Sequence, residues 1–140
     1  MNKRFLKFEV VWKDEHMFEI EVSADNGRYS GTTRVYDTKE SLLPFAQSLE
    51  GFPTGDSKLN YECGEKDNNP FFHVSFYLAN TESVVGVQIT LEEEKDKLVM
   101  DLIVEPNSID IFQKELIQLA NNEEGTAELI GIQKGLNHIR

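Results

Sequence analysis

The sequence holds one pair of residues whose types fit nucleophilic catalysis, Cys63 and His73. They lie on segments predicted to be neighbouring strands, and a thiol beside an imidazole can act as a nucleophile with its general base. Cys63, however, alternates with Leu59 and Tyr61, so we expect it to pack as a small hydrophobic residue. The sequence therefore disfavours a catalytic dyad, and a thiol pKa at or above the ordinary ~8.5 would exclude one.

Metal ligands are not clustered along the chain. The three histidines, His16, His73 and His138, are far apart, and the only cysteine has no second cysteine with which to form a zinc site. Residues 67–69 (Asp-Asn-Asn) offer oxygen ligands, but they lack the remaining spacing of a calcium loop and its bidentate glutamate. They are ordinary turn formers. We predict no metal and no cofactor.

Carboxylates on predicted strands are the remaining candidates for acid–base chemistry. They are Glu19, Glu21, Asp101 and Glu105. Alternation places Glu19 and Glu21 on the solvent face of their strand, where charge is usual on a half-exposed sheet. Glycine-rich nucleotide loops, phosphate loops and nucleophile elbows are absent from the sequence. We therefore predict no catalytic residue and expect that the protein is not an enzyme.

Surface charge is the distinctive chemistry that remains. An acidic run and the strand after it could form a negative patch across a hairpin, and an exposed aromatic side chain beside such charge would favour protein binding. The predicted partner-binding residues are Glu92, Glu93, Glu94, Asp96, Asp101 and Tyr77. Trp12, Tyr29 and Tyr36 are further candidate anchors, and Glu123, Glu124 and Glu128 are further acids of unknown placement. The alternative is a solvated turn beside core aromatics.

The charge balance excludes some partners. The chain has 140 residues, with 25 acidic against 14 basic and a formal net charge of −11. Such a chain is unsuited to nucleic acid, because binding duplexes depends on Lys and Arg that neutralise phosphates. It would also be repelled by an anionic membrane surface, but it could speed encounter with a basic protein partner.

The cysteine count and the apolar pattern indicate the cellular compartment in which the protein works. A single cysteine cannot form an internal disulfide. The first apolar stretch is interrupted by Lys7 and Glu9, which is a strand pattern and not that of a signal peptide. No apolar run approaches the ~20 residues that span a bilayer. We expect a cytoplasmic protein.

Alternating apolar residues predict the strands. Three are expected within Phe5–Trp12, 17–22 and Arg28–Tyr36, with Leu6, Phe8, Val10 and Trp12 on one face of the first. Four more are expected at Leu59–Cys63, Phe72–Leu78, Val85–Leu91 and Leu98–Val104, and a weak one at 129–132. Asp25-Asn26-Gly27 predicts a tight turn. Gly31 within a strand indicates a bulge or a close backbone approach.

Two segments have the spacing of amphipathic helices. Leu42, Phe45, Ala46 and Leu49 form the first apolar stripe, with Ser41 as N-cap or an earlier start at Asp37–Glu40, and Gly51 as the stop. Ile109, Phe112, Leu116 and Leu119 form the second stripe, with Pro106-Asn107-Ser108 supplying capping oxygens and Gln113, Lys114 and Gln118 facing water.

The order of these elements predicts an α+β fold. The connections between strands are too short for parallel crossovers, so we expect a mainly antiparallel curved sheet of about seven strands with the two helices packed on it. The sequence favours a single domain over residues 1–133, with a disordered tail at 134–140.

Parts of the chain resemble a known family. Tyr29-Ser30-Gly31 followed by Ser41-Leu42-Leu43-Pro44-Phe45-Ala46-Gln47-Ser48-Leu49 is similar to the "G…L..FA..L" segment of small bacterial proteins of the WapI-type immunity family. Gly86-Val87-Gln88-Ile89 and the closing helix are similar too. This resemblance implies a cytosolic antitoxin that blocks a toxin domain such as a nuclease, and it assigns no binding residue.

Two functions follow as hypotheses. The first is a non-enzymatic protein-binding protein, most concretely an immunity protein that blocks a basic toxin domain through an acidic surface. The alternative is a small-ligand or carbohydrate-binding module that uses the concave face of the sheet. The sequence leaves the oligomeric state open.

Overall fold

The computed structural model describes residues 3–53, 58–65, 69–79 and 84–133. Within them lie two helices and eight strands in two antiparallel sheets, which confirms the α+β class. The strands are β1 (Phe5–Lys13), β2 (Phe18–Asp25), β3 (Ser30–Asp37), β4 (Lys58–Gly64), β5 (Phe71–Leu78), β6 (Val85–Glu93), β7 (Asp96–Val104) and β8 (Thr126–Ile130). The helices are α1 (Lys39–Ser48) and α2 (Pro106–Asn122). The expected tail lies outside the described residues, as does most of the expected turn at 67–69.

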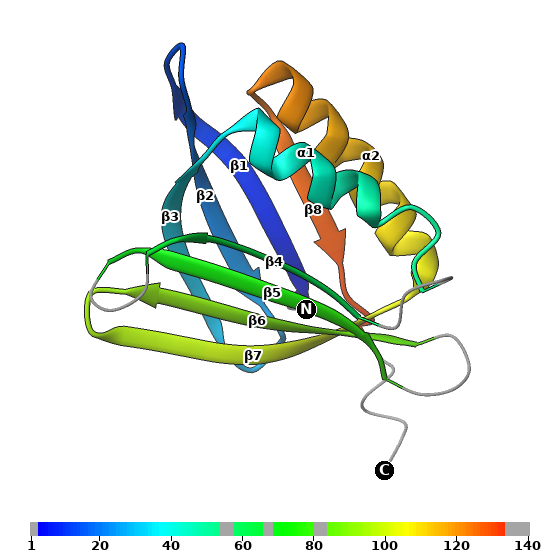
Figure 1. Cartoon of the computed structure of the whole chain (residues 1–140). Coiled ribbons are helices and arrows are strands. Elements are labelled where there is room, and N and C mark those ends of the chain that lie inside the picture. Colours follow the sequence, from blue (N-terminus) through cyan, green and yellow to red (C-terminus); the bar gives the residue numbers. More distant parts are fainter. Residues whose placement is uncertain (1–2, 54–57, 66–68, 80–83, 134–140) are drawn as a thin grey trace.

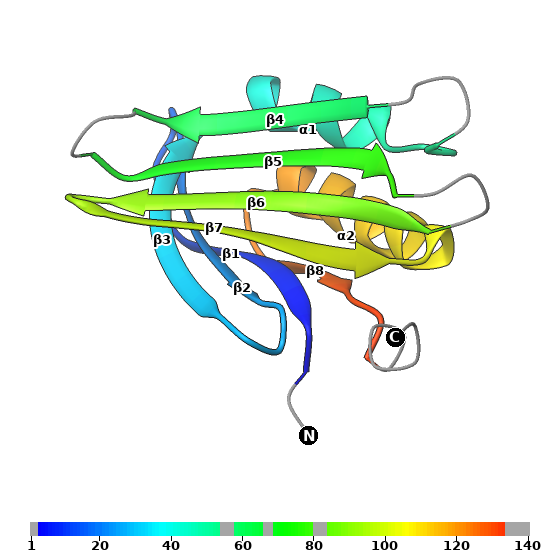
Figure 2. The same cartoon turned by 90° about the horizontal axis from the view of Figure 1, so that it is seen from below.

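The strands divide between two sheets, where the sequence predicted one. Sheet A has the order β3-β2-β1-β8, and sheet B has the order β4-β5-β6-β7. Figure 1 shows the two sheets crossing steeply, with α1 and α2 side by side. Helix α2 packs on sheet A, where Phe112 meets Phe8, and helix α1 packs on sheet B, where Phe45 meets Tyr61. Seen from the other direction in Figure 2, sheet B covers the helices and sheet A, and its outer face is turned toward the viewer. The long connection through α1 carries the chain from one sheet to the other.

Aromatic side chains join the layers. Phe8 of sheet A meets Phe72 of sheet B edge to face, with ring centroids 5.4 Å apart, and meets Phe112 of α2 at 5.7 Å. Phe45 of α1 stacks on Tyr61 of β4 at 4.7 Å. Such contacts add to the burial of large apolar surfaces, so this cluster fixes how both sheets and both helices pack.

One buried polar contact also links the sheets. The Tyr61 hydroxyl on β4 donates to Oδ2 of Asp37 at the end of β3, while Asp37 Oδ1 accepts the backbone N–H of Thr38 at 2.8 Å. Both side chains are nearly or fully buried. Because buried polar groups are costly without partners, this arrangement stabilises one relative position of the two sheets.

The prediction that Trp12 shares the buried face of the first strand is wrong. The register shifts between Val10 and Trp12, so Trp12 lies opposite Glu19 on the outer face of sheet A and is 47% exposed. A bulge adds one residue to a strand and reverses the alternation beyond it. Tyr29, expected within the third strand, precedes β3 and is exposed.

Helix α1 begins earlier than a Ser41 N-cap predicts. Thr38 is the N-cap, and its side chain accepts the backbone N–H of Ser41 at 3.2 Å. Pro44 is therefore inside the helix instead of being its third residue. The carbonyl of Glu40 has no helical donor from Pro44, because proline lacks an N–H. The predicted stripe of Leu42, Phe45 and Ala46 is buried, as expected.

Helix α2 also differs in detail. It begins at Pro106 with Glu105 as N-cap and without a side-chain capping bond, so the expected caps from Asn107 and Ser108 are wrong. Gln113 is buried instead of facing water. It lies against α1, and its Nε2 donates to the carbonyl of Gln47 at 3.4 Å. The residue shares the face of the apolar stripe, where the neighbouring helix excludes solvent.

Candidate functional site

A groove lies between the edge strand of sheet A and the hairpin that joins β6 to β7. Its volume is about 470 Å³. One wall is β3, through Ser30, Gly31 and Thr32, and the other is the hairpin from Leu91 to Leu98. The groove exists because β3 crosses the end of sheet B without pairing with it.

Apolar groups form the base of this groove. A Cβ atom on Gly31 would lie 2.7 Å from Leu98 Cδ2 and 3.2 Å from Leu91 Cδ1, so the glycine lets the two leucines approach the backbone of β3. This confirms the close approach that an isolated strand glycine predicts, and β3 runs past Gly31 in regular register with β2. Leu91 is buried and Leu98 half-buried.

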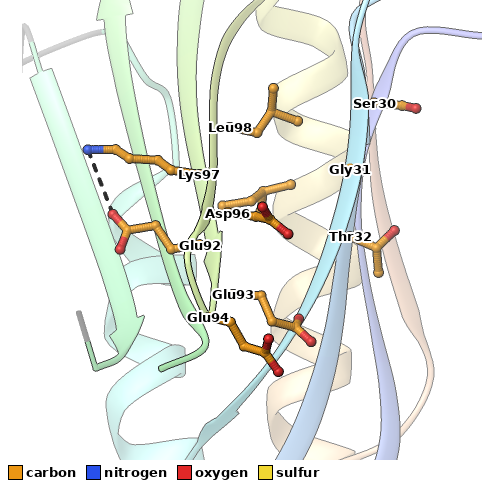
Figure 3. Close-up of a pocket in the computed structure, with 10 residues that line it drawn as sticks. Ser30, Gly31, Thr32, Glu92, Glu93, Glu94, Asp96, Lys97 and Leu98 are labelled. Atoms are coloured by element: carbon orange, nitrogen blue, oxygen red, sulfur yellow. Dashed lines mark ion pairs between the residues drawn. The ribbon is translucent and has the colours of Figure 1, made fainter. Parts of the chain in front are cut away.

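Carboxylates surround that base. In Figure 3, the side chains of Glu93, Glu94 and Asp96 point toward β3. The Thr33 hydroxyl lies 3.1 Å from Glu93 Oε1 and 3.2 Å from the backbone carbonyl of Glu92, so its single proton can serve either acceptor. This contact holds the Glu93 carboxylate against the wall of the groove. Three acidic groups thus share one small volume with an apolar base.

Glu92 differs from the other three acids of the hairpin, Glu93, Glu94 and Asp96. It lies on the outer face of sheet B, as alternation along β6 requires, and its carboxylate is 3.8 Å from Lys97 Nζ. Figure 3 shows this ion pair on the side of the hairpin away from β3. Glu92 is therefore partly neutralised, whereas Glu93, Glu94 and Asp96 carry the charge that faces the groove.

The tip of the hairpin has an unusual backbone. Glu93 pairs with Asp96, which leaves Glu94 and Lys95 as a two-residue turn. Glu94 has a φ of 57°, in the left-handed region that favours glycine. A charged residue thus occupies a strained position beside the groove, and glycine would be the expected choice if stability alone decided it.

Two of the predicted partner-binding residues lie elsewhere. Asp101 and Tyr77 are on the outer face of sheet B, where the Tyr77 hydroxyl donates to Asp101 Oδ1 at 3.3 Å. Burial, followed by the charge of Asp101, raises the pKa of Tyr77. Neither residue lines the groove. The structure therefore brings Glu93, Glu94 and Asp96 together and separates them from this pair.

The acids near the second helix are also apart from the groove. Glu128 on β8 lies 3.1 Å from Lys3 Nζ, and Glu124 lies 3.8 Å from Lys13 Nζ. Glu123 ends α2 in a left-handed conformation and donates its backbone N–H to the Leu119 carbonyl. These three glutamates lie on β8 and at the end of α2, and none of them lines the groove.

Exposed aromatic rings gather on another surface. Trp12 and Tyr36 lie on the outer face of sheet A, on either side of Glu19, with ring centroids 6.1 Å apart. They are 47% and 54% exposed. The bulge in β1 brings the pair together, so the alternation of the sequence could not predict it. This aromatic pair does not line the groove.

The Cys63–His73 pair does not form. Cys63 is paired with Phe72 and lies on the inner face of sheet B, whereas His73 is paired with Glu62 and lies on the outer face. Burial raises the pKa of the Cys63 thiol to about 12. Burial also raises the pKa of the neighbouring Tyr61, with the charges of Cys63 and Asp37 adding to the effect. The thiol is thus protonated and apolar in character at neutral pH.

The described part of the chain has neither a metal-binding cluster nor a membrane-spanning helix. There, three or more His, Cys, Asp or Glu side chains nowhere gather in a way that could hold a metal ion. Neither described helix is long and apolar enough to cross a membrane. The concave inner faces of the sheets carry core side chains such as Val22, Val74 and Ile89.

The sequence pointed to the acidic wall of the groove but missed the other wall. Ser30 and Thr32 are ordinary polar strand residues, and only the isolated Gly31 signalled that something packs closely there. The comparisons with known proteins add no candidate residue, because no protein-family model, curated protein or solved structure matches this chain.

Proposed function

We propose that the protein is a non-enzymatic binding protein that receives basic side chains of a protein partner in the groove between β3 and the β6–β7 hairpin. The observation that carries this proposal is the convergence of Glu93, Glu94 and Asp96 on one groove with an apolar base. The net charge of −11 supports it, because a negative field speeds encounter with a basic protein.

The groove suits lysine and arginine side chains in particular. Their aliphatic stems pack along apolar surface while their charged heads stay near water or carboxylates. Leu91 and Leu98 would contact the stem, and the carboxylates at the hairpin would receive the head. Arginine would gain most, because its guanidinium forms paired hydrogen bonds with carboxylates.

A more specific form of the proposal is an immunity protein that blocks a toxin domain. It rests on the resemblance of residues 29–49 to the WapI-type immunity family and on the chemistry of the groove. A toxin that acts on nucleic acid needs a basic surface to hold phosphates. An acidic groove that occupies this surface would exclude the nucleic acid.

Binding of a fluorescent oligoarginine peptide, followed by anisotropy, tests the groove. The groove variant combines Glu93→Gln, Glu94→Gln and Asp96→Asn. The control variant combines Glu50→Gln, Asp110→Asn and Glu124→Gln, which are exposed carboxylates outside the groove. Both variants lose the same charge, so their difference measures the groove alone.

We expect the groove variant to bind about 10-fold more weakly at low salt, since each exposed ion pair contributes roughly 0.2–1 kcal/mol. The control variant should change by less than about 2-fold, because screened distant charges contribute little. Equal losses in the two variants would show that net charge, and not the groove, binds the peptide. For the immunity role, a toxin domain encoded beside the gene should lose its toxicity when the two are produced together. Full toxicity with saturating protein would contradict that role.

A further inference from the structure

The outer face of sheet B has a hollow that adjoins the acidic groove and shares Glu92 and Lys97 with it. Its volume is about 300 Å³, at the lower end of the range for small-molecule sites. Figure 2 looks onto this face. The polar lining includes His73 of β5 and Gln88 and Thr90 of β6, bounded by Glu62 of β4 and Lys97 of β7. All four strands of the sheet thus contribute a side chain.

A buried hydroxyl without a partner lies one row beyond this hollow. Ser75 does not line the hollow itself, but it points to the same outer face, directly opposite Gln88 and two residues from His73, and is only 5% exposed. Its Oγ is the one buried side-chain polar atom in the described residues that has no hydrogen-bond partner. Buried polar groups in folded proteins are nearly always paired, so an orphan group calls for an explanation.

The neighbouring side chains explain how this hydroxyl could be reached. Ser75 lies on an outer face, so the longer side chains around it cover it. Gln88 is exposed and has three rotatable side-chain bonds. Rotation of Gln88 would extend the hollow over Ser75, and side-chain changes of this kind are common on binding.

The next row of the same face carries an aromatic ring. A Cβ on Gly86 would collide with the Tyr77 ring, so the ring lies close over the glycine. The Tyr77 hydroxyl in turn donates to Asp101 Oδ1. Beyond Ser75, this face therefore presents an aromatic ring and a carboxylate.

We propose that this face binds a small, uncharged, polyhydroxylated molecule of monosaccharide size. Gln88, His73, Thr90 and Ser75 offer both donors and acceptors, which ring hydroxyls need. The carboxylates of Glu62 and Glu92 disfavour an anion, and the ion pair between Lys97 and Glu92 reduces the negative charge that would attract a cation. In this assignment, the Ser75 hydroxyl finds its missing partner in the ligand.

Calorimetric titration of the full chain tests the proposal. The probes are glucose, galactose, N-acetylglucosamine and myo-inositol, with glucose 6-phosphate and spermidine as charged controls. At least one neutral probe should bind with a dissociation constant no weaker than about 10 mM. Ser75→Ala and Gln88→Ala should each weaken that binding about 3–10-fold, the value of one or two hydrogen bonds. Ser23→Ala on sheet A and Gln118→Ala on α2 are the matched controls and should leave it unchanged.

Thermal unfolding separates binding from a structural role. An orphan hydroxyl adds nothing to folding, so Ser75→Ala should unfold at the same temperature as the original protein or at a higher one. Three outcomes would overturn the proposal. In the first, no neutral probe binds, whether or not a charged control does. In the second, Ser75→Ala and Gln88→Ala bind the neutral probe as tightly as the original protein does. In the third, Ser75→Ala unfolds at a lower temperature than the original protein.

Discussion

Glu94, at the tip of the β6–β7 hairpin, has a left-handed backbone with a φ of 57°. This conformation costs a residue with a side chain roughly 1–2 kcal/mol, whereas glycine loses about 0.5–1 kcal/mol more chain entropy on folding. Glu94→Gly should therefore raise the free energy of unfolding by about 0.5–1 kcal/mol, or the melting temperature by about 2–4 °C. If the Glu94 carboxylate serves the groove, the same change should weaken oligoarginine binding about 2–5-fold at low salt.

The chain offers a matched control for this substitution. Glu123 has a φ of 54° at the end of α2, a position where glycine is usual. Glu123→Gly removes the same charge and relieves the same strain, but Glu123 does not line the groove. We expect the same gain in stability and no loss of binding. Urea unfolding and peptide anisotropy measure the two effects separately.

The results for the two variants together show whether Glu94 is present at this turn for its carboxylate or without a role in the groove. If both variants gain stability and only Glu94→Gly loses binding, stability is sacrificed for function at this turn. Unchanged binding for Glu94→Gly would refute a role of this carboxylate in the groove. Lower stability in both variants would show that the left-handed backbone is not strained at these glutamates.

Three further predictions concern the packing and titration of the sheets. Tyr61→Phe should lower the free energy of unfolding by about 1–3 kcal/mol, because it leaves the buried Asp37 oxygen unpaired; a loss below about 0.5 kcal/mol in urea unfolding would contradict this. Burial gives the Cys63 thiol a pKa of about 12 in the folded protein, against about 8.5 in the unfolded chain. Its contribution to the free energy of unfolding should therefore be complete below about pH 8.5 and should be lost as the pH rises toward 12. At about pH 10 the loss is about 2 kcal/mol, and Cys63→Ala should flatten the measured pH dependence of stability; an unchanged slope would count against the burial of the thiol. Gly86→Ala should displace the Tyr77 ring and its hydrogen bond to Asp101 and so destabilise the fold by about 0.5–1.5 kcal/mol, and an unaltered melting temperature would refute that contact.

Local patterns in the sequence predicted most of the elements. Period-two alternation located the strands, because one face of each is buried while the other meets solvent. The turn at Asp25-Asn26-Gly27 was predicted by residue type, and its side chains do cap the turn, with Asn26 Oδ1 accepting the backbone N–H of Arg28 and of Tyr29. The spacing of apolar residues located both helices.

The division into two sheets was not predictable in the same way. Alternation shows which side of a strand is buried, but not which other strand covers it. The separate sheets follow from pairings far apart in the chain, such as β1 with β8. Trp12 was misplaced because a bulge in β1 shifts its register with β2, and Gln113 was misplaced because a second helix covers it.

Of the candidate site, only the acidic wall could be predicted, because local patterns show what is close along the chain and not what packs across sheets. The acids of the hairpin are contiguous in sequence, so their proximity to one another followed from the turn. Their proximity to Ser30 and Thr32 depends on how β3 crosses sheet B, which no local pattern encodes. The distance of Asp101 from the groove follows from its position on the opposite face of the sheet.

An amide NMR titration with oligoarginine peptide at low salt locates the contact residue by residue and so shows whether the groove itself binds basic side chains. The groove hypothesis predicts the largest shift changes at 30–32 and 91–98, which form the two walls. It also predicts that these changes vanish in the variant without Glu93, Glu94 and Asp96 carboxylates. Changes centred on Trp12 and Tyr36, or spread evenly over the acidic surface, would contradict it.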